Sequence, residues 1–350
     1  MSTHHWSFAV SKRIGSSVLH HPAYATTLAR LISASQTCMH SQNITLVGPP
    51  QAGKSTALGA LVKFFNQNVS ETNALGPLPA VRITLKNKGH NGSLDSKSVW
   101  TESLHAVQHP FFDTSELTMG VEDFRRLVDI HNATNGSMGG VLERAIHCRQ
   151  IRLVIFDKAH NLRHAGGGSS KGMSQMLAML ENLGTSTGAT ILFSGGYPLL
   201  DTMAHSPDLL GRQRLIEIRR YQGHIRKDIA AFNSILAWLS DGIQFDDKTT
   251  SLSKMAEYLF EHSAGVFGLV ATWVVNAIQE MHAHGHSRLT RSHFEATRKP
   301  PCALAPILNE IERGEALIDG VVAPEPPRTK RKSKLPFRAK PQRRDAGARL

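Results

Sequence analysis

The sequence predicts an α/β fold, with a P-loop parallel-sheet core followed by a C-terminal all-helical lid domain. Three observations lead to this prediction. Short apolar runs alternate with helical stretches between residues 43 and 218, a glycine-rich loop connects the first run to a helix, and strand-like runs stop near Gln222. Strands separated by helices are typical of parallel βαβ sheets, and the end of the strands indicates a second domain.

The elements follow one another in four segments. Residues 1–42 form a lead-in that becomes helical after Pro22, since proline is favoured in the first turn of a helix. The core, 43–218, contains strand candidates at 44–47, 80–85, 153–156, 190–193 and 215–218. The lid, 219–322, contains helical runs at 225–239, 252–262, 266–282 and 291–298. The tail, 323–350, is rich in Pro, Lys and Arg and has few large apolar residues, so we expect it to be disordered when free.

The first strand leads directly into a loop with the pattern G-x-x-x-x-G-K-[ST], which is followed by a helix. In this arrangement backbone N–H groups and the helix N-terminus surround phosphate oxygens. We therefore expect Lys54 to reach the β- and γ-phosphates of ATP and the Ser55 hydroxyl to bind Mg²⁺. The expected nucleotide-binding residues are Gly48, Pro49, Pro50, Gln51, Ala52, Gly53, Lys54, Ser55 and Thr56.

A carboxylate at the end of a neighbouring strand is expected to complete the metal site, and Asp157 follows the apolar run 153–156. The next residue is Lys158. Many P-loop ATPases carry a glutamate at this position, and it activates the attacking water. An ammonium group cannot act as that base near neutral pH unless its pKa is strongly depressed. Lys158 could instead pair with γ-phosphate oxygens, and His160 is an alternative base. The sequence thus predicts ATP binding and leaves hydrolysis open.

Two further polar positions belong to the predicted site. Ser194 ends the fourth strand, where a polar side chain can sense the γ-phosphate. Arg212 precedes the last strand, where an exposed arginine can stabilise transition-state charge at a neighbouring subunit's nucleotide, and Arg214 is the alternative.

Composition restricts the function classes. Apolar residues make up 41% of the chain, enough for a core, so wholesale disorder is excluded. Cys38, Cys148 and Cys302 form no C-x-x-C pair, which excludes a disulfide framework and a cysteine zinc site. The N-terminus has no apolar secretory stretch, and no run is long enough to span a bilayer. We therefore expect a cytoplasmic protein without a membrane partner.

The positive charge is concentrated at one end. The net charge is +12, and residues 324–350 contribute +8 through ten basic and two acidic side chains. A strongly basic arm on a mildly basic body indicates an acidic polymer as partner, and duplex DNA would fit, because neutralisation of backbone phosphates by Lys and Arg is a sequence-independent source of affinity. A solubilising or localisation tail is the alternative.

Together these motifs resemble those of AAA+ ATPases and, more narrowly, the TnsC/TniB family of transposition regulators. The segments that carry the narrower resemblance are HPAY from residue 21, TLVGPPQAGKST from 45, LVIFDKAHNL from 153 and ILFSGGYPLLDTMAHSPDLLGR from 191. The family usually has Asp-Glu where this chain has Asp157-Lys158. The resemblance implies ATP-bound rings or filaments on duplex DNA that link a TniQ-type target selector, in some systems with a CRISPR effector, to transposase subunits.

The resemblance also implies where the body of the protein contacts DNA. In AAA+ rings the region after the second strand tends to face the central pore, and here it carries Lys86, Lys88 and Lys97. A solvated loop is the alternative. Two other functions stay open: a scaffold in which ATP only supports assembly, and a helicase-loader or secretion-type AAA+ ATPase unrelated to transposition.

Overall fold

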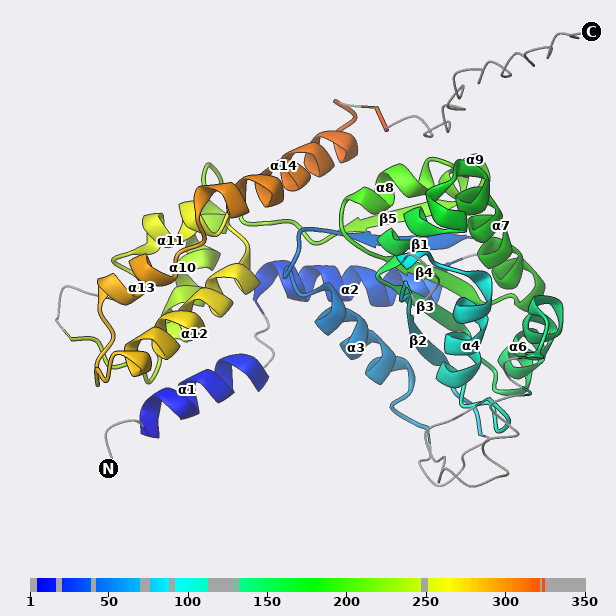
Figure 1. The fold of residues 1–350 in the computed structure, drawn as a ribbon, viewed down its shortest axis with the longest axis horizontal. Helices are drawn as coiled ribbons and strands as arrows, with labels where there is room; N and C mark the ends of the chain where they lie inside the picture. Colours follow the sequence, from blue (N-terminus) through cyan, green and yellow to red (C-terminus); the bar gives the residue numbers. More distant parts are fainter. Residues whose placement is uncertain are drawn as a thin grey trace, which may run out of the picture.

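The computed structural model describes residues 5–16, 21–38, 42–69, 76–87, 92–112, 129, 132–246, 251–321 and 323–324. Five parallel strands form one sheet in the order β2-β3-β4-β1-β5 (Figure 1). The strands are β1 (Asn43–Val47), β2 (Ala80–Thr84), β3 (Leu153–Asp157), β4 (Thr190–Ser194) and β5 (Gln213–Glu217). Each of the five predicted strands is present, with ends within two residues of those expected.

Helices cover both faces of this sheet, because its strands are apolar on both sides. Alternate residues of β3 enter different cores: Leu153 and Ile155 pack with α2 and α3, whereas Val154 and Phe156 pack with α4, α6 and α7. The helices of this sheet body are α2 (Pro22–Thr37), α3 (Lys54–Phe65), α4 (Ser96–Ala106), α6 (Asn135–Cys148), α7 (Ser170–Thr187), α8 (Pro198–Met203) and α9 (Pro207–Gly211). The 3-10 helices η2 (Ala159–His164) and η3 (Gly166–Gly168) follow β3.

A second body is entirely helical and has its own core. It contains α10 (Arg226–Ser240), α11 (Ala256–His262), α12 (Phe267–Ala283) and α13 (Arg291–Thr297), in agreement with the predicted helical runs. The two helices of the N-terminal segment, residues 1–42, pack on different bodies. α1 (His5–Ser16) packs on α12, and Arg13 of α1 donates to Asp241 at 3.0 Å, whereas α2 packs on α3 and β5.

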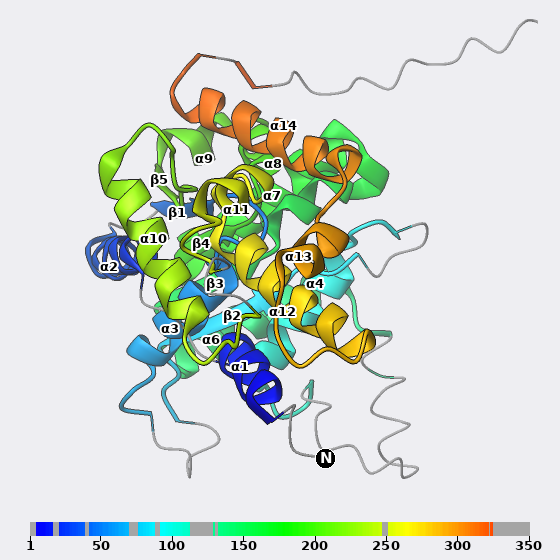
Figure 2. The same ribbon diagram turned by 90° about the vertical axis from the view of Figure 1, so that its left-hand side faces the viewer.

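The last helix, α14 (Pro301–Ile318), was not among the predicted helical runs. It begins beside the helical body and extends over the sheet body to α8 (Figures 1 and 2). Its buried Ile311 belongs to the core of the sheet body, so residues 219–322 are not confined to the helical body. The predicted disordered tail lies outside the described residues, apart from Ala323 and Pro324.

No single helix in the described part of the chain is long and apolar enough to cross a membrane. Within the described residues one helix pair, α11 and α12, reaches the required length and composition together, and the two helices are bent by 110° relative to each other.

Candidate nucleotide-binding site

The backbone conformation of the glycine-rich loop depends on Gly48 and Gly53. A Cβ atom at Gly48 would lie 2.5 Å from the carbonyl oxygen of Ile218, so the loop leaves β1 against the backbone that follows β5. Gly53 has φ +92°, a left-handed conformation that favours glycine, and it immediately precedes α3. The predicted strand, loop and helix are therefore all present, and the N-terminus of α3 faces the space in front of the loop.

Lys54 is held inside this loop. Its ammonium group donates to the carbonyl oxygens of Gly48 at 2.7 Å and Pro49 at 2.6 Å. Burial lowers the pKa of Lys54 to about 8, and the negative charges of Glu310 and then Asp157 partly oppose that shift. Among the described residues, the hydrogen-bond acceptors of this buried ammonium are two neutral carbonyls, so the group fits a site for anionic phosphate oxygens.

Asp157 and Ser55 meet as expected of a Mg²⁺ site. The Ser55 hydroxyl donates to Oδ2 of Asp157 at 3.2 Å, and the backbone N–H of Lys158 donates to its Oδ1 at 2.8 Å. Hydroxyl and carboxylate oxygens are ligands that Mg²⁺ accepts. The expectation that Asp157 ends a strand neighbouring the P-loop strand was wrong, since β4 is inserted between β1 and β3.

An arginine that the sequence analysis missed also contacts this carboxylate. Arg82 of β2 forms an ion pair with Oδ2 of Asp157 and donates to the carbonyl oxygen of Ser55 at 3.2 Å. The sequence feature that could have identified Arg82 is that it is the one charged residue of the strand β2, AVRIT. Because β2 is an edge strand next to β3, Arg82 can reach across the end of the sheet. Asp157 therefore already has a cationic partner where Mg²⁺ is expected.

Ser194 and His160 place two buried polar atoms beside the metal-site residues. Ser194 pairs in register with Asp157 on one side and Leu46 on the other, and its hydroxyl is buried without a hydrogen-bond partner among the described residues. Nδ1 of His160 is also buried and has no hydrogen-bond partner among the described residues. Burial, and after it the positive charge of Arg163 and Lys54, lowers the pKa of His160, so its ring is neutral near pH 7. These atoms suit polar ligands such as phosphate oxygens or water.

The side chain of Lys158 does not join Ser55, Asp157, Ser194 and His160 in the candidate site. It has φ 57° and ψ 35°, a left-handed conformation, and its side chain is exposed at the start of η2. The position that would carry the water-activating glutamate therefore supplies no carboxylate.

Arg212 lies at the other edge of the sheet. Its carbonyl oxygen accepts from the N–H of Asn43, at the amino end of β1, whereas the P-loop follows the carboxyl end. The guanidinium group pairs with Glu181 at 3.5 Å, and its side chain is 49% exposed. Arg214, also exposed, donates to Thr37. Neither arginine lies near the nucleotide site of its own chain, so their predicted role requires another copy.

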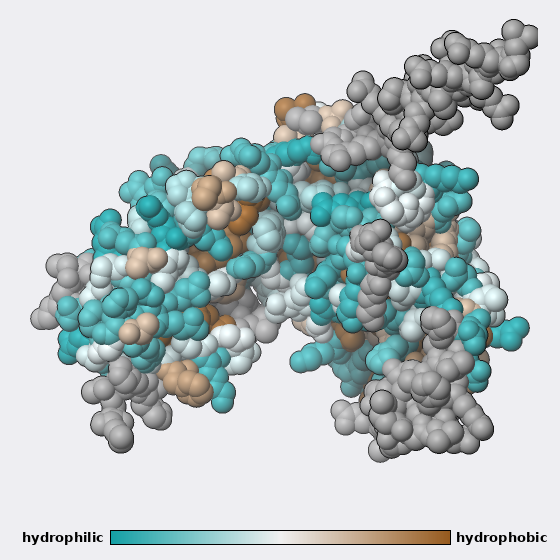
Figure 3. All heavy atoms as spheres, viewed as in Figure 1, coloured by the Kyte–Doolittle hydropathy of each residue, from teal (hydrophilic) through white to brown (hydrophobic). Residues whose placement is uncertain are grey.

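The helical body closes one side of the site. Gly268 of α12 lies against Gln51 of the loop, and Thr272 donates to the Gln51 side chain at 3.1 Å. A cavity of about 530 Å³ lies between the bodies, where the surface is hollowed (Figure 3). It is lined by Ile14, Gly15 and Ser16, by 51–56 of the loop, and by Phe267, Gly268, Ala271, Thr272 and Val275 of α12.

The predicted DNA-binding lysines are only partly described. Lys86 is exposed after β2 and pairs with Glu102 of α4 at 3.4 Å. Lys97 lies half-buried in the first turn of α4, and Lys88 lies outside the described residues. Lys86 and Lys97 therefore lie on one side of the sheet body, next to the edge strand β2.

Comparison with known proteins supports the fold. Residues 37–203 match the family model of an AAA domain. The ORC1 protein of Aeropyrum pernix, solved in complex with DNA, superposes with a TM-score of 0.53 at 12% identity, covering 89% of this chain and 81% of that one. A Walker-type ATPase of Pyrococcus abyssi matches with a TM-score of 0.46 at 17% identity, covering 84% and 76%. The ORC2 protein of A. pernix, in ADPNP and ADP complexes, matches with a TM-score of 0.48 at 13% identity, covering 82% and 71%.

No curated protein matches the chain. The predicted fold class is confirmed by the parallel sheet, the P-loop and the AAA-domain match. The chain therefore has a P-loop AAA fold with a helical C-terminal region.

Proposed function

We propose that this chain is an ATP-dependent DNA-binding AAA+ protein that oligomerises on duplex DNA and regulates transposition. The observation that carries the proposal is the meeting of Lys54, Ser55 and Asp157 at the carboxyl ends of the strands. They lie beside the Ser194 hydroxyl, which has no hydrogen-bond partner among the described residues. Lys54 would bind the β- and γ-phosphates of ATP. Ser55 and Asp157 would hold Mg²⁺, which neutralises phosphate charge when bound.

DNA binding is supported by charge. The basic residues after Pro324 supply a sequence-independent attraction to phosphates, and Lys86 and Lys97 are candidate backbone contacts of the body. A structural relative of this fold, A. pernix ORC1, was solved in complex with DNA. Arg212 supports self-association, since it lies away from the chain's own nucleotide site and can stabilise phosphate charge in a ring or filament.

The transposition role is supported by the motif segments around His21, Gly48, Asp157 and Ser194, which resemble the TnsC/TniB family. In this role the DNA-bound assembly links a TniQ-type selector, with or without a CRISPR effector, to transposase subunits. The neighbouring genes test this part: a transposase operon supports it, and replication or secretion genes contradict it.

DNA binding is tested by the salt dependence of duplex affinity, measured with the full chain and with a chain truncated after Val322. Each lost phosphate contact reduces the slope of log affinity against log salt concentration by about 0.9 on duplex DNA. We expect a shallower slope in the truncated chain, with unchanged ATP binding. An unaltered slope would contradict the role of the basic tail, and absence of DNA binding by the full chain would contradict the proposed function.

A further inference from the structure

The helix α14 is fixed tightly onto the sheet body. A Cβ atom at Gly314 would lie 2.0 Å from the ring of Tyr197, so the helix backbone rests directly on that ring. The Tyr197 hydroxyl in turn donates to Glu217 at 2.7 Å. Because Tyr197 lies three residues after Ser194, α14 docks beside the end of β4 that faces the nucleotide site.

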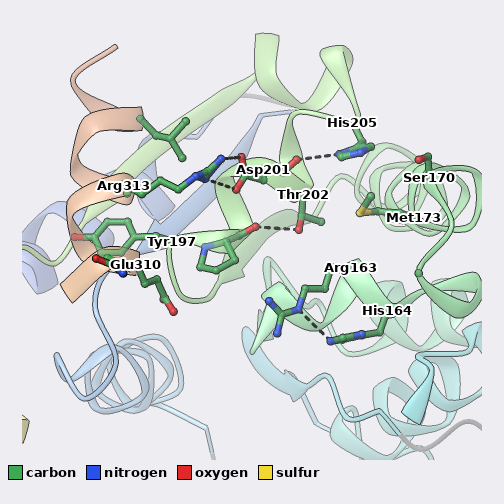
Figure 4. A pocket seen from close by; sticks show the side chains of 15 residues that line it. Arg163, His164, Ser170, Met173, Tyr197, Asp201, Thr202, His205, Glu310 and Arg313 are labelled. Atoms are coloured by element: carbon green, nitrogen blue, oxygen red, sulfur yellow. Dashed lines mark hydrogen bonds and ion pairs between the residues drawn. The ribbon is translucent and has the colours of Figure 1, made fainter. Parts of the chain in front are cut away.

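Two bidentate ion pairs set the rotation of α14. Arg313 donates to both carboxylate oxygens of Asp201 in α8, at 3.0 and 2.9 Å (Figure 4). On a neighbouring part of the helix, Glu315 accepts two bonds from Arg220, both at 2.9 Å. Bidentate arginine–carboxylate pairs fix geometry as well as charge. The side chains on this stretch of α14 are therefore held in defined directions.

This docking brings a carboxylate to the nucleotide site. Oε1 of Glu310 would lie 2.8 Å from a Cβ atom at Gly196, the second residue after Ser194. The Glu310 side chain extends away from the Arg313–Asp201 pair (Figure 4). Its negative charge raises the pKa of Lys54, in the direction opposite to the larger effect of burial. Glu310 is thus an acid near the lysine expected to bind the γ-phosphate.

Hydrolysis of ATP at this site would require a general base that can take a proton from the attacking water. Lys158 supplies no carboxylate, and His160 is an unfavourable base, because taking a proton would add positive charge beside Arg163, Lys54 and Lys158. A glutamate that takes a proton instead loses its negative charge next to phosphate, which relieves repulsion.

We propose that Glu310 is the general base for ATP hydrolysis, supplied from the C-terminal helix in place of the glutamate missing after Asp157. The inference rests on the proposed ATP-binding function of Lys54, Ser55 and Asp157. A water oxygen attacks the γ-phosphorus as one water proton passes to the Glu310 carboxylate. The bond between the γ-phosphorus and the bridging oxygen breaks, and the electron pair leaves with ADP. Phosphate and ADP are the products, and the proton on Glu310 returns to solvent.

The test compares Glu310→Gln with Glu312→Gln, an equally conservative change at an exposed position of the same helix. The full-length variants are assayed with duplex DNA for ATP turnover, and separately for binding of a fluorescent ATP analogue. A general base contributes about 10²- to 10⁴-fold to a rate, so Glu310→Gln should lower kcat by at least about 100-fold. Its affinity for the nucleotide should stay within about threefold of wild type, and Glu312→Gln should leave both quantities unchanged. Because α14 stays docked in the variant, the melting temperature should not change.

The outcomes separate this inference from the proposed function. A wild-type chain that binds no ATP contradicts the proposed function, and the inference falls with it. A wild-type chain that binds ATP without measurable turnover, or a Glu310→Gln variant that retains the wild-type kcat, overturns the inference alone. Tighter ATP binding in Glu310→Gln with unchanged kcat would show that Glu310 only repels phosphate. A loss in His160→Gln but not in Glu310→Gln would identify the histidine as the base.

Discussion

A Cβ atom at Gly268 would lie 2.2 Å from the carbonyl oxygen of Gln51, so the backbone of α12 contacts the backbone of the P-loop directly. Thr272, one turn later on the same helix, donates to the Gln51 side chain at 3.1 Å. The helical body is therefore in direct contact with the loop expected to bind phosphate, so we expect a change in their separation to alter nucleotide binding.

Replacement of Gly268 by alanine should weaken ATP binding. Overpacking at a close contact costs about 1–3 kcal/mol, and the contact relaxes by moving α12 away from the loop. Gly59→Ala is the matched control, because it adds the same methyl group to a helix where no atom lies within 4 Å. We expect about a fivefold or larger loss of affinity for a fluorescent ATP analogue in Gly268→Ala only. Equal affinities in the two variants would show that the helical body does not support the loop.

The ion pair between Arg82 and Asp157 predicts a competition with Mg²⁺. In Arg82→Gln the carboxylate loses its cationic partner, so Mg²⁺ should bind Ser55 and Asp157 more tightly. Hydrogen bonds to charged groups contribute about 1.5–3 kcal/mol, which corresponds to at least about a tenfold decrease in the Mg²⁺ concentration needed for half-maximal ATP binding. Arg152→Gln, an exposed change just before β3, is the control. A higher Mg²⁺ requirement in Arg82→Gln would mean that the arginine itself supports nucleotide binding.

His21 predicts a dependence of folding stability on pH. Nδ1 of this buried residue accepts from the N–H of Tyr24 and lies 2.6 Å from the Tyr221 hydroxyl, and burial lowers its pKa to about 4. The unfolded chain takes up this proton near pH 6.5. The stability contribution is therefore complete above pH 6.5, decreases as the pH falls from 6.5 to 4, and is absent below. The loss amounts to about 3 kcal/mol at most.

The measurement for His21 is the difference in melting temperature between wild type and His21→Asn from pH 7.5 to 4.5. Asparagine retains the helix cap and does not titrate. We expect the advantage of wild type to shrink on acidification, since the variant lacks this proton uptake. A constant difference over this range would mean that His21 does not stay neutral in the folded chain.

Features that depend on neighbouring residues in the chain could be predicted from sequence. The five strands, the P-loop and the Asp157 strand end each follow from a local pattern of apolar residues and glycines, and the structure confirms them. The order of the strands could not be read in this way, because β4 enters between β1 and β3 only when the whole sheet assembles. The expectation that Asp157 ends a strand neighbouring β1 failed for this reason.

The features of the site that could not be predicted from sequence depend on contacts between distant segments of the chain. Arg82 lies 75 residues from Asp157, and Glu310 lies on a helix that crosses from one body to the other, so no spacing rule connects either residue to the P-loop. Gly314 and Tyr197 fix that crossing through shape, which a single sequence does not reveal. The meeting of Ser55 with Asp157 could be expected from the sequence, whereas the proximity of Arg82 and Glu310 to this site could not.

In the proposed function, ATP held by Lys54 drives assembly on DNA. Electron micrographs of the protein with duplex DNA and a slowly hydrolysed ATP analogue test it most directly. The wild type and Lys63→Ala, an exposed change on α3, should form rings or filaments only when the analogue is present. Lys54→Ala should form none, because the phosphate charge loses its main counter-ion. Nucleotide-dependent assemblies that persist in Lys54→Ala, or a wild type that never assembles, would contradict the account.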